Sequence, residues 1–307
     1  MIETQHLGRV FDGTVAVEDV SFSIKDGEAF AFLGPNGAGK TTTVRMLCCL
    51  IGATTGTGFI DGLDIREKSN HIKIRSMIGL LPENPGMYES LSAHRNLDFY
   101  ARLYGVPESE REARISEMLK RLGIYERRND AVGKFSKGMK QKIAIARALM
   151  HEPSYIFLDE PTAALDPEAA LTVRNFLMEL KKEGRTIFLN THNLDEAQRV
   201  CDRIGVLKTR LLATGTPDEL SSRFFGKSTV VGLKETNPDY LLALRQLPGV
   251  LDAKIGDKCI LISVADPASQ NPSIISTLVA KGAQIEYVQE VKHGLEDIYL
   301  KLMGDSK

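Results

Sequence analysis

The sequence predicts an α/β fold with a mostly parallel sheet, an antiparallel β-subdomain and a helical insert, followed by a small α+β domain. Four apolar runs typical of buried strands alternate with amphipathic helical segments, which favours the parallel sheet. These runs are Ala29–Leu33, Tyr155–Leu158, Thr186–Leu189 and a stretch around Ile204. A chain of 307 residues exceeds one domain of ordinary size. We therefore expect two domains, 1–220 and 221–307.

The first 30 residues alternate apolar and polar side chains, which predicts an antiparallel sheet. The segment Lys25-Asp-Gly-Glu28 has the composition of a hairpin turn within that sheet. A second hairpin is expected over Gly58–Ile65. Together these segments predict the antiparallel β-subdomain, with Phe11 on one of its strands.

A glycine-rich loop follows the first buried strand and fits the phosphate-loop pattern of Gly, four residues, Gly, Lys and then Ser or Thr. Its residues are Gly34, Pro35, Asn36, Gly37, Ala38, Gly39, Lys40, Thr41 and Thr42. A helix is expected over Thr41–Leu50. The glycines let backbone amides converge on phosphate oxygens, and the helix start adds partial positive charge. Lys40 is expected to span the outer phosphates, and Thr41 to place its hydroxyl on a magnesium ion. This loop alone leaves kinases, GTPases and other phosphate-loop proteins open.

Two adjacent carboxylates end the strand Tyr155–Leu158. Asp159 is placed to reach the metal opposite Thr41. Glu160 points to the other side of the strand end, where a carboxylate can orient and deprotonate a water for in-line attack. Next to the phosphate loop, this pair predicts nucleoside triphosphate hydrolysis rather than two solvated acids.

The helical insert covers about residues 86–152. Leu97, Tyr100, Leu103 and Tyr104 are expected on one helix face, and Ile115, Met118, Leu119 and Leu122 on the next. Ser136 is expected to be the N-cap of a helix over Gly138–Met150. Its hydroxyl, the free amides and the helix dipole could then face an anion, although an ordinary capped helix would show the same pattern.

After Leu220 a β-α-β-β-α-β order predicts a small ferredoxin-like domain without a catalytic cluster. The expected strands are Ser228–Lys234, Val250–Ile255, Cys259–Val264 and Ile285–Val288. The expected helices begin at Asn237-Pro238, with Leu241 and Leu244 inward, and near Pro272, ending at Gly282. An amphipathic tail, Leu295–Leu302, ends the pattern.

Composition narrows the function classes. A formal charge of −1, from 39 basic and 40 acidic residues, argues against nucleic acid as a partner. The four cysteines lack metal-ligand spacing and are expected to be buried thiols in a reducing cytosol. No leader pattern and no apolar stretch of membrane-spanning length is visible, so a membrane partner is expected to be a separate polypeptide.

Residues 1–220 resemble the ATP-binding cassette (ABC) family, the motor subunits of ABC transporters. The family has a Leu-Ser-Gly-Gly-Gln signature before the second phosphate motif, and this chain has Phe135-Ser-Lys-Gly-Met139 there, in which Ser136 and Gly138 match. Ala164-Leu-Asp166 resembles the loop whose aspartate bridges to the partner subunit. His192, after the strand Thr186–Leu189, resembles the switch histidine, where an imidazole can donate to the transferred phosphate. A lone histidine at a strand end is more often structural.

Two positions depart from the family pattern. Phe11 stands where a tyrosine commonly stacks on adenine, and its ring keeps the π-face. Glu83, in Leu81-Pro-Glu-Asn84, replaces a glutamine that senses the metal, and its carboxylate can still bind magnesium through oxygen. The resemblance also implies that residues 84–90 touch the transmembrane partner.

The resemblance implies a P-loop NTPase fold of the ABC-ATPase type and an ATPase with ATP and Mg²⁺ as cofactors. It further implies a head-to-tail dimer, homomeric or heteromeric, in which Ser136, Gly138 and Asp166 act on the partner's nucleotide. A separate permease would hold the chain peripherally on the cytoplasmic face of the membrane, for export of drugs or other hydrophobic cargo. Export-type members often carry a small C-terminal domain with a Leu-Glu-Asp segment like Leu295-Glu-Asp297. This domain is expected to be regulatory or dimer-supporting, and the alternative is a tether of no specific function. The alternatives are a soluble ABC-type ATPase of translation or DNA repair, and a phosphate-loop kinase.

Overall fold

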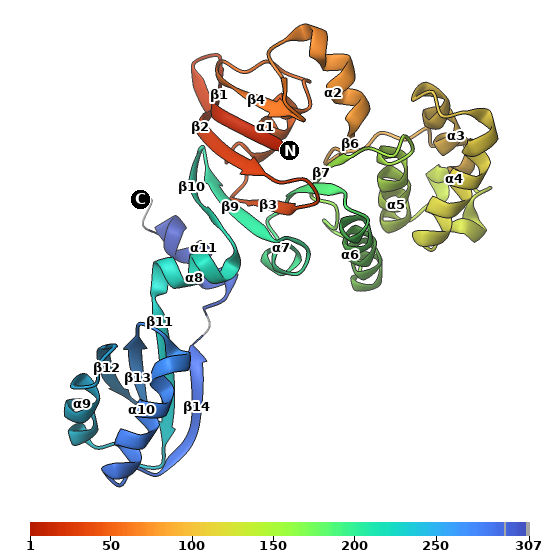
Figure 1. Ribbon diagram of the computed structural model, residues 1–307. Coiled ribbons are helices and arrows are strands. Elements are labelled where there is room, and N and C mark those ends of the chain that lie inside the picture. The colour runs from red at the N-terminus through yellow and green to blue at the C-terminus, as the bar shows by residue number, and fades with distance from the viewer. Residues whose placement is uncertain (292, 305–307) are drawn as a thin grey trace. The chain divides into compact units, whose positions relative to one another are not determined.

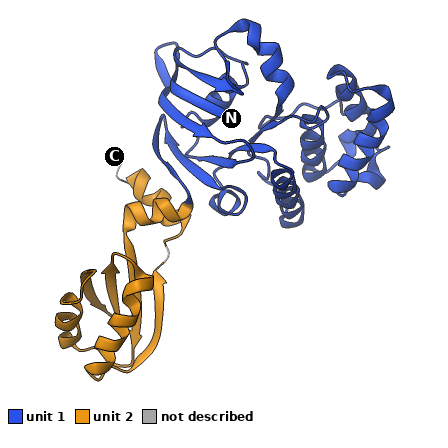
Figure 2. Ribbon diagram, in the orientation of Figure 1, with its two compact units in different colours: residues 1–216 blue, residues 217–307 orange. Residues whose placement is uncertain are grey.

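A computed structural model describes residues 1–291 and 293–304 of the chain. It divides after Thr216 into two compact units, 1–216 and 217–307, which we describe separately (Figure 2). The first unit contains two sheets and the helical insert, and the second contains one sheet with its helices (Figure 1). None of the helices in the described residues combines the length and the apolar character that a bilayer crossing requires.

The main sheet of the first unit has six strands in the order β10-β9-β3-β8-β7-β6. They are β10 (Arg210–Gly215), β9 (Arg203–Lys208), β3 (Ala29–Leu33), β8 (Thr186–Asn190), β7 (Tyr155–Asp159) and β6 (Ile78–Leu81). All neighbours pair in parallel except the β10/β9 hairpin. Because the carboxyl ends of parallel strands meet at one edge, the phosphate loop after β3 and the carboxylates after β7 lie at the same edge of the sheet. The predicted α/β fold is confirmed, and β6 and β10 are two strands that the sequence analysis did not predict.

The antiparallel β-subdomain has the strand order β2-β1-β4-β5. Its strands are β1 (Ile2–Phe11), β2 (Thr14–Ile24), β4 (Thr55–Ile60) and β5 (Leu63–Asp64). The predicted hairpin turn at Lys25–Glu28 is wrong, because this turn leads from β2 in the small sheet to β3 in the main sheet. The hairpin turn lies instead at Asp12-Gly13, where both residues have positive φ and Phe11 pairs with Thr14.

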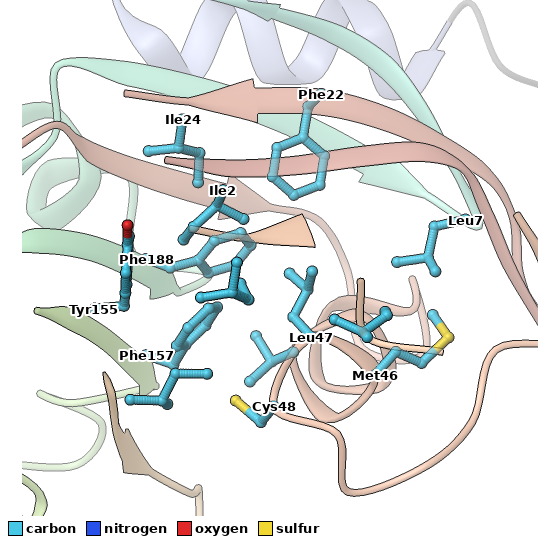
Figure 3. Close-up of a cluster of buried hydrophobic side chains, with 14 of the residues drawn as sticks. Ile2, Leu7, Phe22, Ile24, Met46, Leu47, Cys48, Tyr155, Phe157 and Phe188 are labelled. Atoms are coloured by element: carbon cyan, nitrogen blue, oxygen red, sulfur yellow. The ribbon is translucent and has the colours of Figure 1, made fainter. Parts of the chain in front are cut away.

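A shared core joins the two sheets of the first unit (Figure 3). The Phe22 ring on β2 stacks on the Phe30 ring on β3 at 5.4 Å and meets the Phe188 ring on β8 at 5.9 Å. Met46 and Leu47, on the helix that follows the phosphate loop, are buried in the same cluster. These contacts fix the orientation of the strand and of the helix on either side of the loop.

The helices of the first unit are α1 (Lys40–Leu47), α2 (His71–Met77), α3 (Ala93–Leu103), α4 (Glu108–Arg121), α5 (Lys137–Ala148), α6 (Pro167–Lys182) and α7 (Leu194–Val200), with short 3₁₀ turns at Lys68–Asn70, Tyr125–Arg127 and Val132–Lys134. In the helical insert the face predicted on α4 is buried, including Leu119 and Leu122. The face predicted on α3 is only partly right, because Leu97 is buried while Leu103 and Tyr104 are exposed. Helix α1 ends three residues before the predicted Leu50, since Cys49 adopts a left-handed backbone.

The second unit has four strands in the order β12-β13-β11-β14, all antiparallel, which is the ferredoxin-like arrangement. Its elements are α8 (Pro217–Phe225), β11 (Lys227–Leu233), α9 (Pro238–Arg245), β12 (Val250–Gly256), β13 (Cys259–Val264), α10 (Pro267–Ala280), β14 (Ile285–Val291) and α11 (Leu295–Gly304). Helices α9 and α10 pack on the sheet through Leu244, Ile274 and Leu278. The start predicted for α10 near Pro272 is wrong. Asp266 caps the helix and Pro267 occupies its first position, so Pro272 lies inside it.

Candidate functional site

The phosphate loop closes tightly between β3 and α1. Gly39 is the N-cap of α1 with φ of 96°, and a Cβ atom there would lie 2.5 Å from the carbonyl oxygen of Ala16. Only glycine combines that backbone with that approach. Lys40 turns its side chain back into the loop, where Nζ donates to the carbonyl oxygens of Gly34 at 2.5 Å and Pro35 at 3.2 Å. The loop therefore curves around a cation, as a phosphate site requires.

Lys40 also lies among the carboxylates of the site. Burial lowers the pKa of Lys40, whereas the charges of Glu160, Asp159 and Glu83 act to raise it. The same three acids line one cavity with this ammonium group. The ammonium group therefore offsets part of the negative charge of these acids inside a partly buried site.

Asp159 and Thr41 meet directly across the end of the sheet. The Thr41 hydroxyl donates to Asp159 Oδ2 at 2.7 Å, and Asn190 Nδ2 donates to Asp159 Oδ1 at 3.5 Å. Hydroxyl and carboxylate oxygens are the ligands that Mg²⁺ takes, usually one or two from the protein with phosphates and waters completing the set. Within the described residues no group of three or more His, Cys, Asp or Glu could hold a metal by itself. The donors therefore fit a magnesium ion that is shared with a phosphate ligand.

Glu160 and His192 form a pair beside this centre. Glu160 leaves β7 with φ of 51°, a backbone that is uncommon for a non-glycine residue and that clusters at functional sites. Its N–H donates to the carbonyl oxygen of Asn190 at 2.9 Å, which holds the turn against β8. Glu160 Oε1 lies 2.8 Å from His192 Nδ1. The glutamate side chain is 14% exposed and the imidazole 67%, so this hydrogen bond joins a nearly buried carboxylate to an exposed ring.

One cavity of about 390 Å³ gathers most of the predicted site. It is lined by Phe11, Ala16, Pro35, Asn36, Gly37, Ala38, Gly39, Lys40, Thr41, Thr42, Glu83, Asp159 and Glu160. Phe11 is exposed, and the guanidinium of Arg9 lies over its ring, 4.4 Å from the ring centroid. The cavity thus has an aromatic group at one part of its wall, a cradle of backbone amides, and a set of carboxylates around one lysine.

Ser136, Gly138 and Asp166 lie together at a different place. Ser136 caps α5 by accepting from the N–H of Met139 at 3.2 Å, and Asp166 caps α6 by accepting from the N–H of Ala169 at 2.8 Å. A Cβ atom on Gly138 would lie 3.1 Å from Ala169 Cβ and 3.8 Å from Asp166 Oδ2. Among the described residues, the lining of the 390 Å³ cavity includes none of the three. Two helix N-termini therefore adjoin outside the cavity.

Three buried polar residues around β8 escaped the sequence analysis: Asn190, Thr191 and Glu196. Asn190 contacts Asp159 and Glu160 as described above. Glu196 is 1% exposed, and its carboxylate accepts from the Thr191 hydroxyl. In the sequence Glu196 has the pattern of an acid in the first turn of a helix, which is usually solvated, so only its place in the fold distinguishes it.

Comparison with known proteins identifies a family whose members are similar to this chain in sequence. Residues 17–163 match a family model described as ABC transporter. The linearmycin resistance ATP-binding protein LnrL of Bacillus subtilis (strain 168) is 32% identical, over 99% of this chain and 98% of that protein. The probable multidrug ABC transporter ATP-binding protein YbhF of Escherichia coli (strain K12) is 38% identical over 73% of this chain and 38% of its own length.

Solved structures agree with the sequence relatives. The ATP-binding subunit of an ABC transporter has a TM-score of 0.67 and 33% identity, over 74% of this chain and 94% of that one. A dimeric ATP-binding cassette in a post-hydrolysis state, bound to ADP and Pi, has a TM-score of 0.65 and 27% identity, over 70% of this chain and 98% of that one. The predicted P-loop NTPase fold and the predicted nucleotide-hydrolysing activity are confirmed. This chain belongs to the ATP-binding subunits of the ABC transporter family, whose members are the ATPase motors of their transporters.

Proposed function

We propose that this chain binds MgATP, pairs head to tail with a second ATPase subunit, and uses hydrolysis to drive export by a separate membrane permease. The observation that carries the proposal is the convergence of Lys40, Thr41, Asp159 and Glu160 on one cavity. The soluble alternative, an ATPase of translation or DNA repair, is not favoured by the relatives. Kinase chemistry would leave Glu160 and its hydrogen bond to His192 without a role.

Within the cavity, the phosphate loop holds the triphosphate and Lys40 neutralises its outer charge. Thr41, Asp159 and Glu83 supply oxygen ligands to the magnesium ion, which offsets negative charge on the phosphates when bound. The ring of Phe11 stacks on the adenine. This assignment is supported by the 2.7 Å contact of Thr41 with Asp159 and by the place of Phe11 and Glu83 in the cavity wall.

Glu160 acts as the general base. Its carboxylate accepts a proton from a water as the oxygen of that water attacks the terminal phosphorus. The bond between that phosphorus and the bridging oxygen breaks, phosphate is released, and Lys40 neutralises the charge that remains on the bridging oxygen of ADP. His192 acts as the switch, with its imidazole bonded to the base and donating to the transferred phosphate. The 2.8 Å contact between Glu160 and His192 supports a coupled pair.

Ser136, Gly138 and Asp166 serve the partner subunit's nucleotide in a head-to-tail dimer. Their common location outside this chain's own cavity supports this, because a helix N-terminus with a serine cap can bind phosphate brought from another chain. Each dimer then has two composite sites. The partner is a second copy or a related cassette.

Export is proposed from the relatives named for linearmycin resistance and multidrug transport. The cargo is a drug or other hydrophobic molecule that the permease recognises, and the chain is held at the cytoplasmic face of the membrane by that permease. Co-purification with the membrane subunit tests this proposal, followed by ATPase assays in lipid. Stimulation of turnover by cargo is expected, whereas full activity with no membrane partner bound in the cell would contradict the transport role.

Glu83, which replaces the glutamine of the family pattern, allows a test of the proposed magnesium site. A carboxylate adds one negative charge to the magnesium site, so Glu83→Gln is expected to raise the Mg²⁺ concentration for half-maximal turnover by about threefold to tenfold. At saturating Mg²⁺ the affinity for ATP stays close to that of the wild type. Titration of ATPase activity with Mg²⁺ measures both. The same half-maximal Mg²⁺ concentration in both proteins would remove Glu83 from the metal site.

The second unit is proposed to be a regulatory or dimer-supporting domain rather than a tether. It has its own core around Leu244, Ile274 and Leu278, and so it has the features of an independently folded module. A chain ending at Thr216 is expected to need a severalfold higher protein concentration for half-maximal ATPase activity. An identical concentration dependence in the truncated and full chains would leave the second unit as a tether.

A further inference from the structure

The most deeply buried carboxyl group in the described part of the chain belongs to Glu196, and the proposed function does not use it. The residue is 1% exposed, less than Asp159 at 4% or Glu28 at 9%. It lies in the first turn of α7, just beyond His192. Its neighbour Asp195 is also an acid in that turn, but its side chain is 56% exposed. Favourable placement at a helix start explains Asp195 and does not explain the burial of Glu196.

Three hydrogen bonds close a ring through Glu196 that brackets His192. The Thr191 hydroxyl donates to Glu196 Oε2 at 2.9 Å and accepts from the N–H of Asn193 at 3.0 Å. The side-chain oxygen of Asn193 accepts from the N–H of Glu196 at 3.1 Å. The residues immediately before and after His192 are therefore fixed to Glu196, Thr191 through its carboxyl group and Asn193 through its backbone N–H, and to each other.

His192 needs such support because its own side chain has little. The imidazole is 67% exposed, so packing does not orient it, and its recorded partner is Glu160 Oε1 at 2.8 Å. Thr191 is fully buried, and its N–H donates to the carbonyl oxygen of Phe32 at 3.2 Å. The position of the ring therefore depends on the backbone at Thr191, and that backbone is anchored on one side by β3 and on the other by Glu196.

Burying the carboxyl group of Glu196 costs more free energy than burying an apolar side chain of similar size. Burial raises the pKa of Glu196, an effect opposed by the hydroxyls of Thr162 and Thr191 and reinforced by the charge of Glu160. Its second oxygen, Oε1, is buried without a hydrogen-bond partner among the described residues. An apolar side chain would avoid both costs. However, an apolar side chain could not accept the hydrogen bond that the Thr191 hydroxyl donates.

We propose that Glu196 is a positioning residue for ATP hydrolysis, whose carboxyl oxygen holds Thr191 and so keeps His192 against Glu160. The inference rests on the proposed roles of Glu160 and His192. Glu196 touches neither the nucleotide cavity nor the reacting atoms. Its effect is on the geometry of the pair that does.

Five single variants and one double variant of the full-length chain test the inference. Glu196→Ala and Thr191→Val each remove the hydrogen bond between the Thr191 hydroxyl and the Glu196 carboxyl group. Each is expected to lower kcat by about tenfold to hundredfold while KM for ATP stays within about twofold. Glu196→Gln and Thr191→Ser keep an acceptor and a hydroxyl, and are expected to retain most of the activity. Asp195→Asn, the matched control in the same turn, leaves kcat unchanged. The double variant Glu196→Ala/Thr191→Val is expected to be no worse than Thr191→Val, because that variant already lacks the contact that Glu196→Ala removes.

A normal kcat in Glu196→Ala overturns the inference. It is overturned equally if Glu196→Gln and Thr191→Ser lose activity as the truncating variants do, or if kcat, ATP affinity and melting temperature fall together, since these results indicate a general structural role. The proposed function fails separately, through undiminished turnover in Glu160→Gln. An inactive Glu160→Gln beside a fully active Glu196→Ala counts against the inference alone.

Discussion

Replacing Glu160 by glutamine is expected to lower ATP turnover by about a thousandfold while ATP remains bound. The amide has nearly the shape of the carboxylate but accepts no proton, so the attacking water loses its base. The loop, Lys40, Thr41 and Asp159 are untouched, so the variant keeps its affinity for MgATP. Removing one negative charge near Lys40 favours the triphosphate further, since Glu160 contributes the largest of the charge effects on that lysine.

Phosphate release at saturating MgATP measures the turnover of Glu160→Gln, and a fluorescent ATP analogue measures its binding. Glu168→Gln is the matched control, because Glu168 is an exposed acid in the first turn of α6 and has no place in the cavity. It should hydrolyse ATP like the wild type. Turnover in Glu160→Gln within about twofold of the wild type would overturn its assignment as the base.

Lys40→Ala is expected to weaken ATP binding by about tenfold to hundredfold, because charge-assisted hydrogen bonds contribute about 1.5–3 kcal/mol each. The loss has a second cause. Asp159, Glu83 and Glu160 line the same cavity as the ammonium group, so without it these carboxylates repel the phosphates unopposed. Equilibrium binding of ATP by calorimetry checks the effect, with the melting temperature recorded to show that the variant is folded.

Phe11→Ala provides the comparison at the base end of the same cavity. Loss of one stacked ring is expected to weaken ATP binding by a few-fold only and to leave kcat in place. Phe11→Tyr should bind as the wild type does. ATP affinity in Lys40→Ala equal to that of the wild type would remove Lys40 from the phosphate site, and equal affinity in Phe11→Ala would remove the ring from the base site.

The catalytic edge of the sheet was predictable because its residues follow strands that are recognisable locally. Gly34–Thr42 and the Asp159-Glu160 pair each come directly after a short apolar run, and parallel strands bring such ends together without further information. The approach of Thr41 to Asp159 joins segments more than a hundred residues apart and was still expected from this rule, although their direct hydrogen bond was not.

Strand pairing in the β-subdomain shows where local patterns were insufficient. The chain has two Asp-Gly dipeptides near its start, Asp12-Gly13 and Asp26-Gly27, and both form turns with positive φ at glycine. Only the first joins paired strands. The second directs the chain from one sheet to the other, because the next strand is apolar on both faces and is buried between β8 and β9. The residue types of a turn predict that the chain reverses direction, whereas burial of the next strand determines which sheet that strand joins.

The hydrogen bonds next to His192 were not predictable from the composition or the hydrophobic periodicity of the sequence. Asn190, Thr191 and Glu196 are polar residues at a strand end and a helix start, places where polar residues are ordinarily solvated. Their burial follows from the packing of α7 against the sheet, which no short window of sequence contains. The hydrogen bonds among them therefore became visible only in the folded chain.

Sedimentation of the Glu160→Gln chain with and without MgATP tests the account's central claim most directly. If the grouped Ser136, Gly138 and Asp166 complete the nucleotide site of a partner, a triphosphate that is not hydrolysed should hold two subunits together. We predict a monomer without nucleotide, a dimer with MgATP, and no dimer when Lys40→Ala is added. A Glu160→Gln chain that binds MgATP and still sediments as a monomer would contradict the proposal.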